Sequence, residues 1–477
     1  MLRRLLSSFL ALFLVPFAAA DVTLSPAFRD HAVLQRDQPI TVSGRARPGE
    51  EVQVLFGDVV GRGTATSAGI FSIELPAQPA SAIPRELVVQ GKNRVSVSDI
   101  LVGDVWLCSG QSNMEWTVGS LPEATATVAA ATDPQIRILK TPHALDWSPR
   151  TTAEGSWTVA TGEAVRGCTA IGYFFARELR DSQHVPIGIL DLSWGGTKIE
   201  PWIPLDGVRR DLEIMGEYNA LRNRTDKNEP LSQETPTTMW NAMVAPFSNV
   251  HIKGVAWYQG ESNAGNAPRY RRSLPLLIEA WRKAFGNKSL PFAVFQLASF
   301  MQYRPDLPVE PGWADLRESQ RGGAVAAQAG LIVLLDIGDA NDIHPARKAE
   351  AARRLALWAR AHAYGEKVEY SGPVLTTSTV KDGAMILSFD HADGLATRDG
   401  KPLGGFAIAG ADGKFVWAEA TIDGGHVIVR SKEIAAPTQV RYAWHNNPEG
   451  ANLVNGAGLP AGPFRTDPVE VTPARRR

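Results

Sequence analysis

Ser112 and His344 are the residues whose types and positions point most directly to chemistry. A serine hydroxyl is a weak nucleophile near neutral pH and needs a base within hydrogen-bond distance. Histidine suits that task because its ordinary pKa lies closest to neutrality. Ser112 follows a glycine turn, and His344 follows an apolar run that is typical of a strand. The pair predicts acyl transfer, with Ser112 as nucleophile and His344 as general base.

Each of these residues also has a structural use that the sequence leaves open. Serine after a turn commonly caps a helix, and a lone histidine is more often a structural residue. Asp342 lies two positions before His344, so in an extended loop its carboxylate would approach Nδ1 and stabilise the imidazolium. Asp342 is equally well placed to form an Asx-turn before a helix. The two uses carry equal weight at this point, so Asp342 is a candidate for the third member of a Ser-His-Asp triad.

Four polar segments, three of which contain glycine, follow apolar runs that we interpret as strands. The strand-like runs are residues 105–108, 187–192, 255–258, 292–297 and 332–335. The polar segments are residues 109–114, 193–197, 259–263 and 339–345. In an open parallel sheet, ligands bind beyond the carboxyl ends of the strands. We therefore expect the polar segments to meet at one edge of the sheet.

A tetrahedral intermediate also needs hydrogen-bond donors for its oxyanion. The backbone N–H of Ser112, the Gly195-Gly196 pair and a polar side chain after the third strand are the candidates. Gln259 can donate through its amide, whereas an ionised Glu261 cannot donate and would instead orient its neighbours.

The chain divides into three zones after its first 20 residues. Residues 21–99 hold short alternating runs between turns, which predict a small β-sandwich. Residues 100–365 alternate strands with helices, which predicts a parallel sheet covered on both faces. One helix is expected over residues 346–364, and another carries an apolar stripe of Leu274, Leu277, Ile278, Trp281 and Phe285. Residues 366–477 return to short strands, so we expect a C-terminal β-rich domain.

The first 20 residues resemble a secretory signal sequence. Arg3 and Arg4 precede an apolar run over 5–16, and small alanines follow it. The run is too short to cross a bilayer, so we predict a cleaved signal peptide and a periplasmic or secreted protein, with a retained anchor as the alternative. Lys plus Arg total 49 against 50 for Asp plus Glu, which favours neither nucleic acid nor an anionic membrane as partner. Cys108 and Cys168 are compatible with a disulfide or with two free thiols.

Together the polar segments resemble the SGNH hydrolases, and within them the sialate O-acetylesterase-like carbohydrate esterases. The motifs that carry the resemblance are Gly110-Gln111-Ser112-Asn113-Met114, Trp194-Gly195-Gly196-Thr197, Gln259-Gly260-Glu261-Ser262-Asn263 and Asp342-Ile343-His344-Pro345. The resemblance implies a three-layer α/β/α, flavodoxin-like catalytic domain, no metal and no other cofactor, and deacetylation through an acyl-enzyme. It also implies a triad of Ser112, His344 and Asp342, with Gly196 and either Gln259 or Asn263 at the oxyanion.

Two positions depart from the wider SGNH pattern. That pattern has an aspartate three residues before the histidine, where this chain has Asn341, and Asp342 stands one position closer. It also has an asparagine in the third motif where this chain has Gly260-Glu261-Ser262-Asn263. The third triad member and the oxyanion side chain are therefore both open at this point.

The resemblance implies an O-acetylated carbohydrate as substrate, and two classes remain open. One is sialic acid, for whose carboxylate Arg304 or Arg317 is a candidate partner; the other is acetylated plant hemicellulose such as xyloglucan or xylan. The further candidates for binding the sugar are Gln111, Glu261, Trp240 and Asn241. A secreted carbohydrate-binding protein without catalytic activity, and a general acyl hydrolase of the same fold, are the alternative functions. The sequence does not indicate an oligomeric state.

Overall fold

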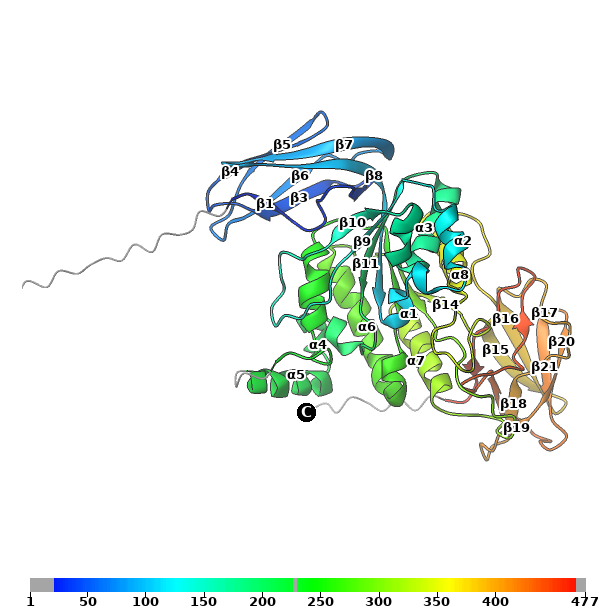
Figure 1. The fold of residues 1–477 in the computed structure, drawn as a ribbon. Helices are drawn as coiled ribbons and strands as arrows, with labels where there is room; N and C mark the ends of the chain where they lie inside the picture. The colour runs from blue at the N-terminus through cyan, green and yellow to red at the C-terminus, as the bar shows by residue number, and fades with distance from the viewer. Residues whose placement is uncertain (1–20, 226–229, 469–477) are drawn as a thin grey trace, which may run out of the picture.

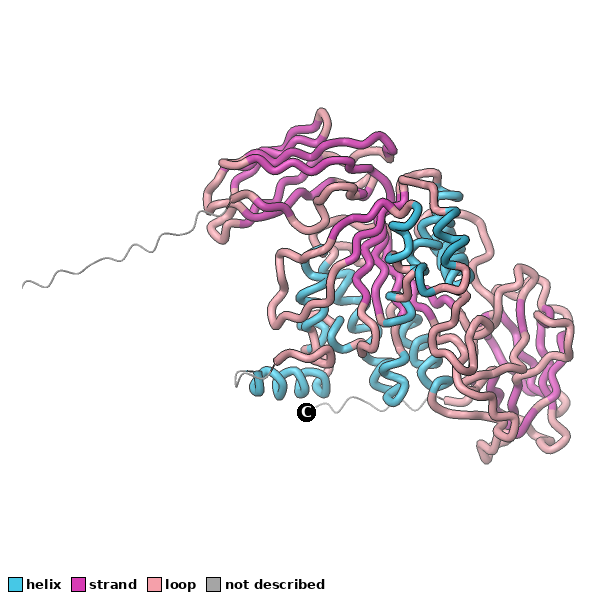
Figure 2. The backbone as a smooth tube through the Cα atoms, viewed as in Figure 1, coloured by secondary structure: helices cyan, strands magenta, loops and turns pink. Residues whose placement is uncertain are grey.

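The computed structural model describes residues 21–225 and 230–468 (Figure 1). The predicted signal peptide over residues 1–20 lies outside them. A central α/β region carries an all-β region at each end of the described chain, as the colouring by secondary structure makes plain (Figure 2). Among the described residues, none of the helices has the length and hydropathy of a membrane span.

The central sheet has the strand order β10-β9-β11-β8-β12-β13-β14. Neighbouring strands run parallel, apart from the antiparallel pair of β9 and β10. The strands are β8 (Arg94–Gly110), β9 (Ile136–Lys140), β10 (Ser156–Val159), β11 (Ile187–Ser193), β12 (Gly254–Tyr258), β13 (Phe292–Phe295) and β14 (Gly330–Ile332). The five predicted strands are present, although the last ends at Ile332 rather than running on to 335, and β9 and β10 were not predicted.

Helices cover both faces of this sheet (Figure 1). Helices α3 (Ala170–Gln183) and α8 (Lys348–His362) pack together on one face, and α6 (Ala267–Ala284) and α7 (Trp313–Ala326) pack together on the other. The remaining helices are α1 (Ser112–Glu115), α2 (Ala124–Ala130), α4 (Leu205–Val208), α5 (Leu212–Thr225), η1 (Val118–Ser120), η2 (Gly162–Gly167), η3 (Glu200–Trp202), η4 (Trp240–Val244), η5 (Ala245–Phe247) and η6 (Glu261–Asn266). The predicted three-layer α/β/α fold is confirmed.

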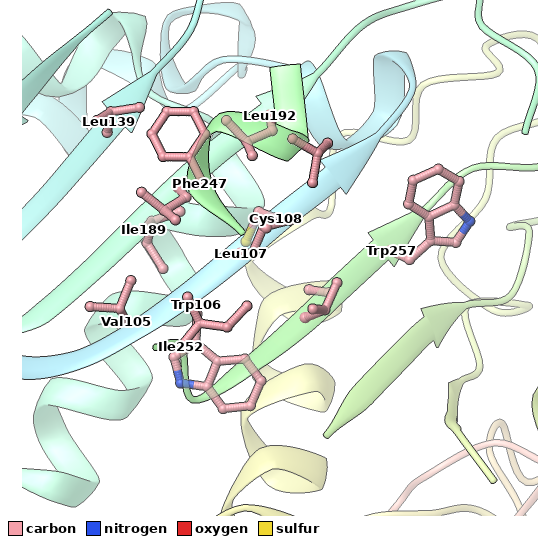
Figure 3. Packing of buried hydrophobic residues seen from close by; sticks show 14 of the residues in the cluster. Val105, Trp106, Leu107, Cys108, Leu139, Ile189, Leu192, Phe247, Ile252 and Trp257 are labelled. Atoms are coloured by element: carbon pink, nitrogen blue, oxygen red, sulfur yellow. The ribbon is translucent and has the colours of Figure 1, made fainter. Parts of the chain in front are cut away.

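The middle strands of the sheet form the core beneath its carboxyl edge. Trp106 and Leu107 of β8 are fully buried and pack among residues of β11 and β12 (Figure 3). Because β8 lies between two strands and two helical layers, its second half is apolar on both faces. This packing holds the end of β8, and the residues that follow it, in one place. The Cys108 and Cys168 thiols are buried and free.

The N-terminal all-β region consists of two packed sheets. One contains β1 (Thr23–Leu24), β3 (Ile40–Arg45) and β6 (Ile70–Leu75). The other contains β2 (Val33–Gln35), β4 (Glu51–Phe56), β5 (Val59–Thr64), β7 (Ser81–Gln90) and the first half of β8. The expected boundary between residues 99 and 100 falls inside β8, which is one continuous strand shared by this region and the central sheet.

The C-terminal region is built from three small sheets. The first contains β15 (Val374–Lys381), β16 (Ala384–Asp390), β20 (Glu419–Asp423) and β21 (His426–Arg430). The second contains β18 (Phe406–Ala409), β19 (Val416–Trp417), β22 (Gln439–Tyr442) and β24 (Phe464–Arg465), and the third pairs β17 (Ala396–Thr397) with β23 (Leu453–Val454). Their buried side chains form a second hydrophobic cluster, separate from the main core.

Candidate active site

Ser112 lies just beyond the carboxyl end of β8 and is the first residue of α1. Gly110 ends β8 with a backbone φ of +129°, and a Cβ atom there would lie 2.0 Å from the carbonyl oxygen of Tyr258. Glycine is therefore required for β8 to pass this close to β12 and turn into α1. The turn brings Ser112 to the edge of the sheet at which the polar segments were expected to meet.

His344 lies in the loop over residues 333–347, between β14 and α8. Its Nε2 is 2.9 Å from the Oγ of Ser112, although the two residues are 232 positions apart in the chain. The structure therefore brings the predicted nucleophile and base into hydrogen-bond contact. In that geometry a neutral imidazole can accept the hydroxyl proton.

Asp342 lies beside His344 but makes a loose contact with its ring. Its Oδ1 is 3.4 Å from Nδ1 of His344, and the same oxygen accepts the backbone N–H of His344 at 2.8 Å. The Asp342 side chain is 55% exposed, compared with 22% for His344. Burial lowers the pKa of His344, and the Asp342 charge opposes that shift. Asp342 thus makes both of the contacts considered from the sequence, one to the imidazole of His344 and one to the backbone of an Asx-turn. The backbone contact is the shorter of the two.

Trp116 also holds the imidazole, and the sequence reasoning missed it. The two rings stack with centroids 4.4 Å apart and an interplanar angle of 18°. Trp116 follows α1 directly, four residues after Ser112, so one short segment provides both the predicted nucleophile and the ring that stacks on the predicted base. The four-residue spacing was the available signal, since it returns a side chain to the same side of a helix.

The Gly195-Gly196 turn lies against Ser112. A Cβ atom on Gly195 would be 3.3 Å from the Cβ of Ser112, and the Gly195 N–H donates to Oε2 of Glu115 at 2.7 Å. Gly196 has a φ of +73°, which glycine adopts without strain. The backbone N–H groups of Ser112 and Gly196 donate to no other group within the described residues. Both are therefore available to a ligand.

Glu115 fixes this turn from α1, and it too was missed. Its Oε1 lies 2.7 Å from Nε2 of His143, whose ring stacks on Trp194 at 4.3 Å between centroids. Lys140 approaches the same carboxylate at 3.8 Å. The glycine turn is thus held by a charged and aromatic cluster on one side of the site.

Gln259 and Asn263 are not placed as oxyanion donors. Gln259 is fully buried, and its Nε2 donates to Asn263 Oδ1, Thr197 O and Gln111 Oε1 at 2.8, 3.0 and 3.2 Å. The Asn263 amide donates to Glu200 Oε2 at 3.1 Å. Since these amide groups are used inside the protein, assigning either side chain to the oxyanion is wrong in this structure.

Three comparisons with known proteins agree with one another. The family described as carbohydrate esterase, sialic acid-specific acetylesterase, matches residues 102–350. The sialate O-acetylesterase of Mus musculus is 30% identical over 451 residues, which covers 82% of each chain, and that of Homo sapiens is 32% identical over 327 residues, which covers 63% of this chain and 61% of the human one. The crystal structure of a carbohydrate acetylesterase from Xanthomonas citri superimposes with a TM-score of 0.85 at 42% identity, covering 94% of this chain and 100% of that one.

The chain belongs to the sialic acid-specific acetylesterase family of carbohydrate esterases. It is a carboxylic ester hydrolase. The matched residues 102–350 include all four polar segments that form the site, from the end of β8 to the start of α8.

Trp240 and Asn241 of this esterase, which were predicted to bind the sugar, are both buried. Trp240 is 5% exposed and packs against Trp281, with ring centroids 5.5 Å apart. The Asn241 amide donates to the carbonyl oxygen of Asp146 at 3.1 Å. Both side chains face the protein interior because η4 is enclosed along its whole length.

Arg317 is likewise a structural residue of the esterase, not a partner for a substrate carboxylate. Its side chain is fully buried on α7, and its guanidinium donates to four backbone carbonyls. Two belong to Leu297 and Ala298, both at 2.8 Å, and two to His445 and Asn446, at 2.7 and 2.9 Å. It therefore joins the segment after β13 to the C-terminal region.

Gln111 and Glu261 support the site from beneath it. Gln111 Oε1 accepts from the backbone N–H of Ser262 at 3.2 Å and so ties the first motif to the third. Glu261 Oε1 accepts from the Asn113 amide at 2.6 Å, and its buried Oε2 has no partner within the described residues. Both contacts lie within the protein, and the one from Glu261 reaches Asn113, the residue after Ser112.

Within residues 21–225 and 230–468, no group of three or more His, Cys, Asp and Glu side chains is arranged to hold a metal ion.

Proposed function

We propose that the enzyme hydrolyses acetyl esters of carbohydrates, with Ser112 as nucleophile and His344 as general base. The contact of 2.9 Å between Ser112 Oγ and His344 Nε2 carries this proposal. The two groups come from opposite ends of the catalytic region, so their meeting is a product of the whole fold. Stacking on Trp116 keeps the imidazole in the plane that this contact needs.

The reaction begins when His344 takes the proton of Ser112 as Oγ attacks the acetyl carbonyl carbon. A tetrahedral intermediate forms, with negative charge on the former carbonyl oxygen. The imidazolium then returns the proton to the sugar oxygen, the ester C–O bond breaks, and the sugar leaves as an alcohol. A water molecule then attacks the acetyl carbonyl carbon while His344 takes one of its protons. The bond between that carbon and Oγ of Ser112 breaks, the imidazolium returns the proton to Oγ, and acetate leaves.

The backbone N–H groups of Ser112 and Gly196 are the proposed donors to the oxyanion. Both lack a partner within the described residues, and the Gly195 turn lies against Ser112. Loss of one such donor typically raises the barrier by about 3–4 kcal/mol. The contact of Glu115 with the Gly195 N–H holds the turn in position for this role.

The proposed substrate class is an O-acetylated carbohydrate, because the related proteins are named as sialate O-acetylesterases and as a carbohydrate acetylesterase. Of the two arginines considered for a sialate carboxylate, Arg317 is buried and Arg304 is paired with Asp306 at 2.8 Å. Acetate release from acetylated sialosides, xyloglucan and xylan, measured side by side, separates sialic acid from hemicellulose as substrate.

The test of the mechanism compares Ser112→Ala with the exposed control Ser120→Ala on a chromogenic acetyl ester. We expect Ser112→Ala to lower kcat by about 10³-fold or more, because no other hydroxyl replaces Oγ. Ser120→Ala should keep the wild-type rate, since its hydroxyl bonds Thr117 on the surface. A Ser112→Ala enzyme with near wild-type activity would overturn the proposal.

The signal-peptide prediction adds a proposed location, the periplasm or the medium. N-terminal sequencing of the protein from the periplasmic fraction or the culture medium should begin near Asp21. A mature chain that keeps residues 1–20 and sediments with membranes would instead favour the retained anchor.

A further inference from the structure

Lys348 is a buried cation directly behind the Ser112–His344 pair, and the proposed mechanism does not use it. It is the first residue of α8 and is 1% exposed. Its ammonium donates to Oδ1 of Asn113, the residue that follows Ser112. An ammonium is costly to bury, so a lysine at this position needs a specific reason.

The Asn113 amide extends this contact to both sides of the site. Its Nδ2 donates to Oε1 of Glu261 at 2.6 Å and to the carbonyl oxygen of Ile343 at 3.0 Å. Ile343 immediately precedes His344. One carboxamide therefore joins the helix of the nucleophile to the loop of the base.

The direction of this amide depends on its two charged neighbours. Lys348 can only donate and an ionised Glu261 can only accept, so together they place Oδ1 of Asn113 toward the lysine and Nδ2 toward the glutamate. With Nδ2 in that position, it also reaches the carbonyl of Ile343. If the amide were reversed, its oxygen would face the Ile343 carbonyl, and two acceptors would repel each other.

The groups that face the Lys348 ammonium come from three elements. Glu261 lies on η6, Asp342 and His344 lie on the loop over 333–347, and the ring of Tyr258 on β12 is 5.7 Å away. Burial lowers the pKa of Lys348 to about 7, while both carboxylates oppose the shift. At pH values below this pKa the lysine is mostly cationic. Burial is the main cause that lowers the pKa of His344, and the charge of Lys348 lowers it further.

We propose that Lys348 is a positioning residue, which orients the Asn113 amide and thereby clamps the His344 loop onto the helix that carries Ser112. The inference rests on the proposed Ser112–His344 mechanism and adds to it. Without the lysine, Oδ1 of Asn113 loses its donor and the amide is free to turn. The Ile343 carbonyl then loses its anchor, and the distance from Nε2 to Oγ increases. A displacement of about 1 Å costs about 10²-fold in rate.

The first experiment measures kcat, KM and the pH profile of Lys348→Met on an acetyl ester. We expect kcat to fall about 10²-fold with KM within about threefold, because the substrate-binding surface is unchanged. We also expect the acidic limb of kcat/KM to move to higher pH, because a cation that lowered the pKa of His344 is gone. Lys348→Arg keeps the charge and a donor, so its acidic limb should stay at the wild-type pH and part of kcat should return.

Arg354→Met is the matched control, because Arg354 is a second buried cation on α8. It pairs with Asp336 at 2.6 Å and with Glu350 at 2.8 Å. Its loss should lower the unfolding midpoint without moving the acidic limb. A Lys348→Met enzyme with wild-type kcat overturns the proposal. The proposal is also overturned if the kcat of Lys348→Met falls, its acidic limb stays at the wild-type pH and Lys348→Arg recovers no activity. Lost packing alone would explain that result.

Asn113→Asp tests the same contact while keeping the lysine, and it decides the matter if Lys348→Met does not fold. The added oxygen would face the acceptors of Glu261 and Ile343, so we expect a similar fall in kcat. A wild-type rate would overturn the proposal. Ser112→Ala and His344→Ala are measured alongside: if they keep activity, the mechanism itself fails, whereas if they lose activity and Lys348→Met does not, this inference alone fails.

Discussion

At the scale of single residues, His344 is oriented by three contacts of different kinds. Nε2 meets the Ser112 hydroxyl, the ring face lies on Trp116, and Asp342 approaches Nδ1 at 3.4 Å. The contact to Asp342 is the longest of the polar ones, and its carboxylate is the most exposed of these groups. The stacked ring therefore takes over part of the orienting role that a buried aspartate has in a tight triad.

Asp342→Asn should reduce kcat by no more than about tenfold, against about 10³-fold for His344→Ala. The asparagine keeps an oxygen for the His344 backbone N–H at 2.8 Å, so the loop should hold its shape and the change isolates the charge. Steady-state kinetics on an acetyl ester measures both variants. A loss of 10³-fold in Asp342→Asn would instead make Asp342 a full triad member.

The pH dependence of kcat/KM reports the same histidine. His344 must be neutral to accept a proton, so activity is lost as the pH falls through its pKa. Burial lowers that pKa, which predicts an acidic limb below the usual value of 6.5. Because the Asp342 charge raises the pKa, Asp342→Asn should move the limb to still lower pH. A limb above pH 6.5 in the wild type would contradict this account.

At the scale of elements, β8 is the strand that determines where Ser112, the proposed nucleophile, lies. Residues in its first half alternate between partly buried and exposed, as in a sheet with one solvated face, and its second half is wholly buried in the central sheet. The strand thus changes partners without a break. Its carboxyl end, between β11 and β12, is the place where an open α/β sheet binds ligands.

Gly110→Ala should disrupt this end of β8. The new Cβ would lie 2.0 Å from the Tyr258 carbonyl oxygen at a φ of +129°, so strain and overlap together should cost about 2–5 kcal/mol. Chemical denaturation measures the loss of stability, and the acetyl-ester assay should show a loss of activity. Gly167→Ala is the control, because nothing lies within 4 Å of its Cβ position. Equal stability of the two variants would refute the argument.

At the scale of the whole molecule, the C-terminal β region is attached to the catalytic region through α7. Arg317 on α7 bonds carbonyls of residues 297–298 on one side and 445–446 on the other. Asn446 also accepts the backbone N–H of Trp313 at 2.8 Å, which begins α7. The C-terminal region thereby supports the segment that follows β13.

Arg317→Met should lower the unfolding midpoint by the equivalent of about 3–5 kcal/mol, since four buried carbonyls lose their donor. Thermal unfolding, together with limited proteolysis of residues 296–312, measures the effect. Arg304→Met, which removes an exposed arginine paired with Asp306, should leave the midpoint unchanged. If both variants unfold like the wild type, the guanidinium is not what holds the two regions together.

Much of this architecture followed from local patterns in the chain. Periodicity predicted β8, β11, β12, β13 and β14 and helices between them, because a buried strand or an amphipathic helix shows its burial within a few residues. It missed β9 and the edge strand β10, which form an antiparallel pair at one end of the sheet. Ser112 and His344 were found because the carboxyl ends of parallel strands share one edge.

The sequence by itself therefore determined the layers, the edge that carries the site and the two groups that meet there. Tertiary structure alone decided that Trp116 supports the imidazole, that Lys348 reaches Asn113, and that Gln259 and Arg317 are buried. Such contacts join residues up to 235 positions apart. Their formation depends on how helices and loops pack, and no pattern within one segment of the chain contains that information.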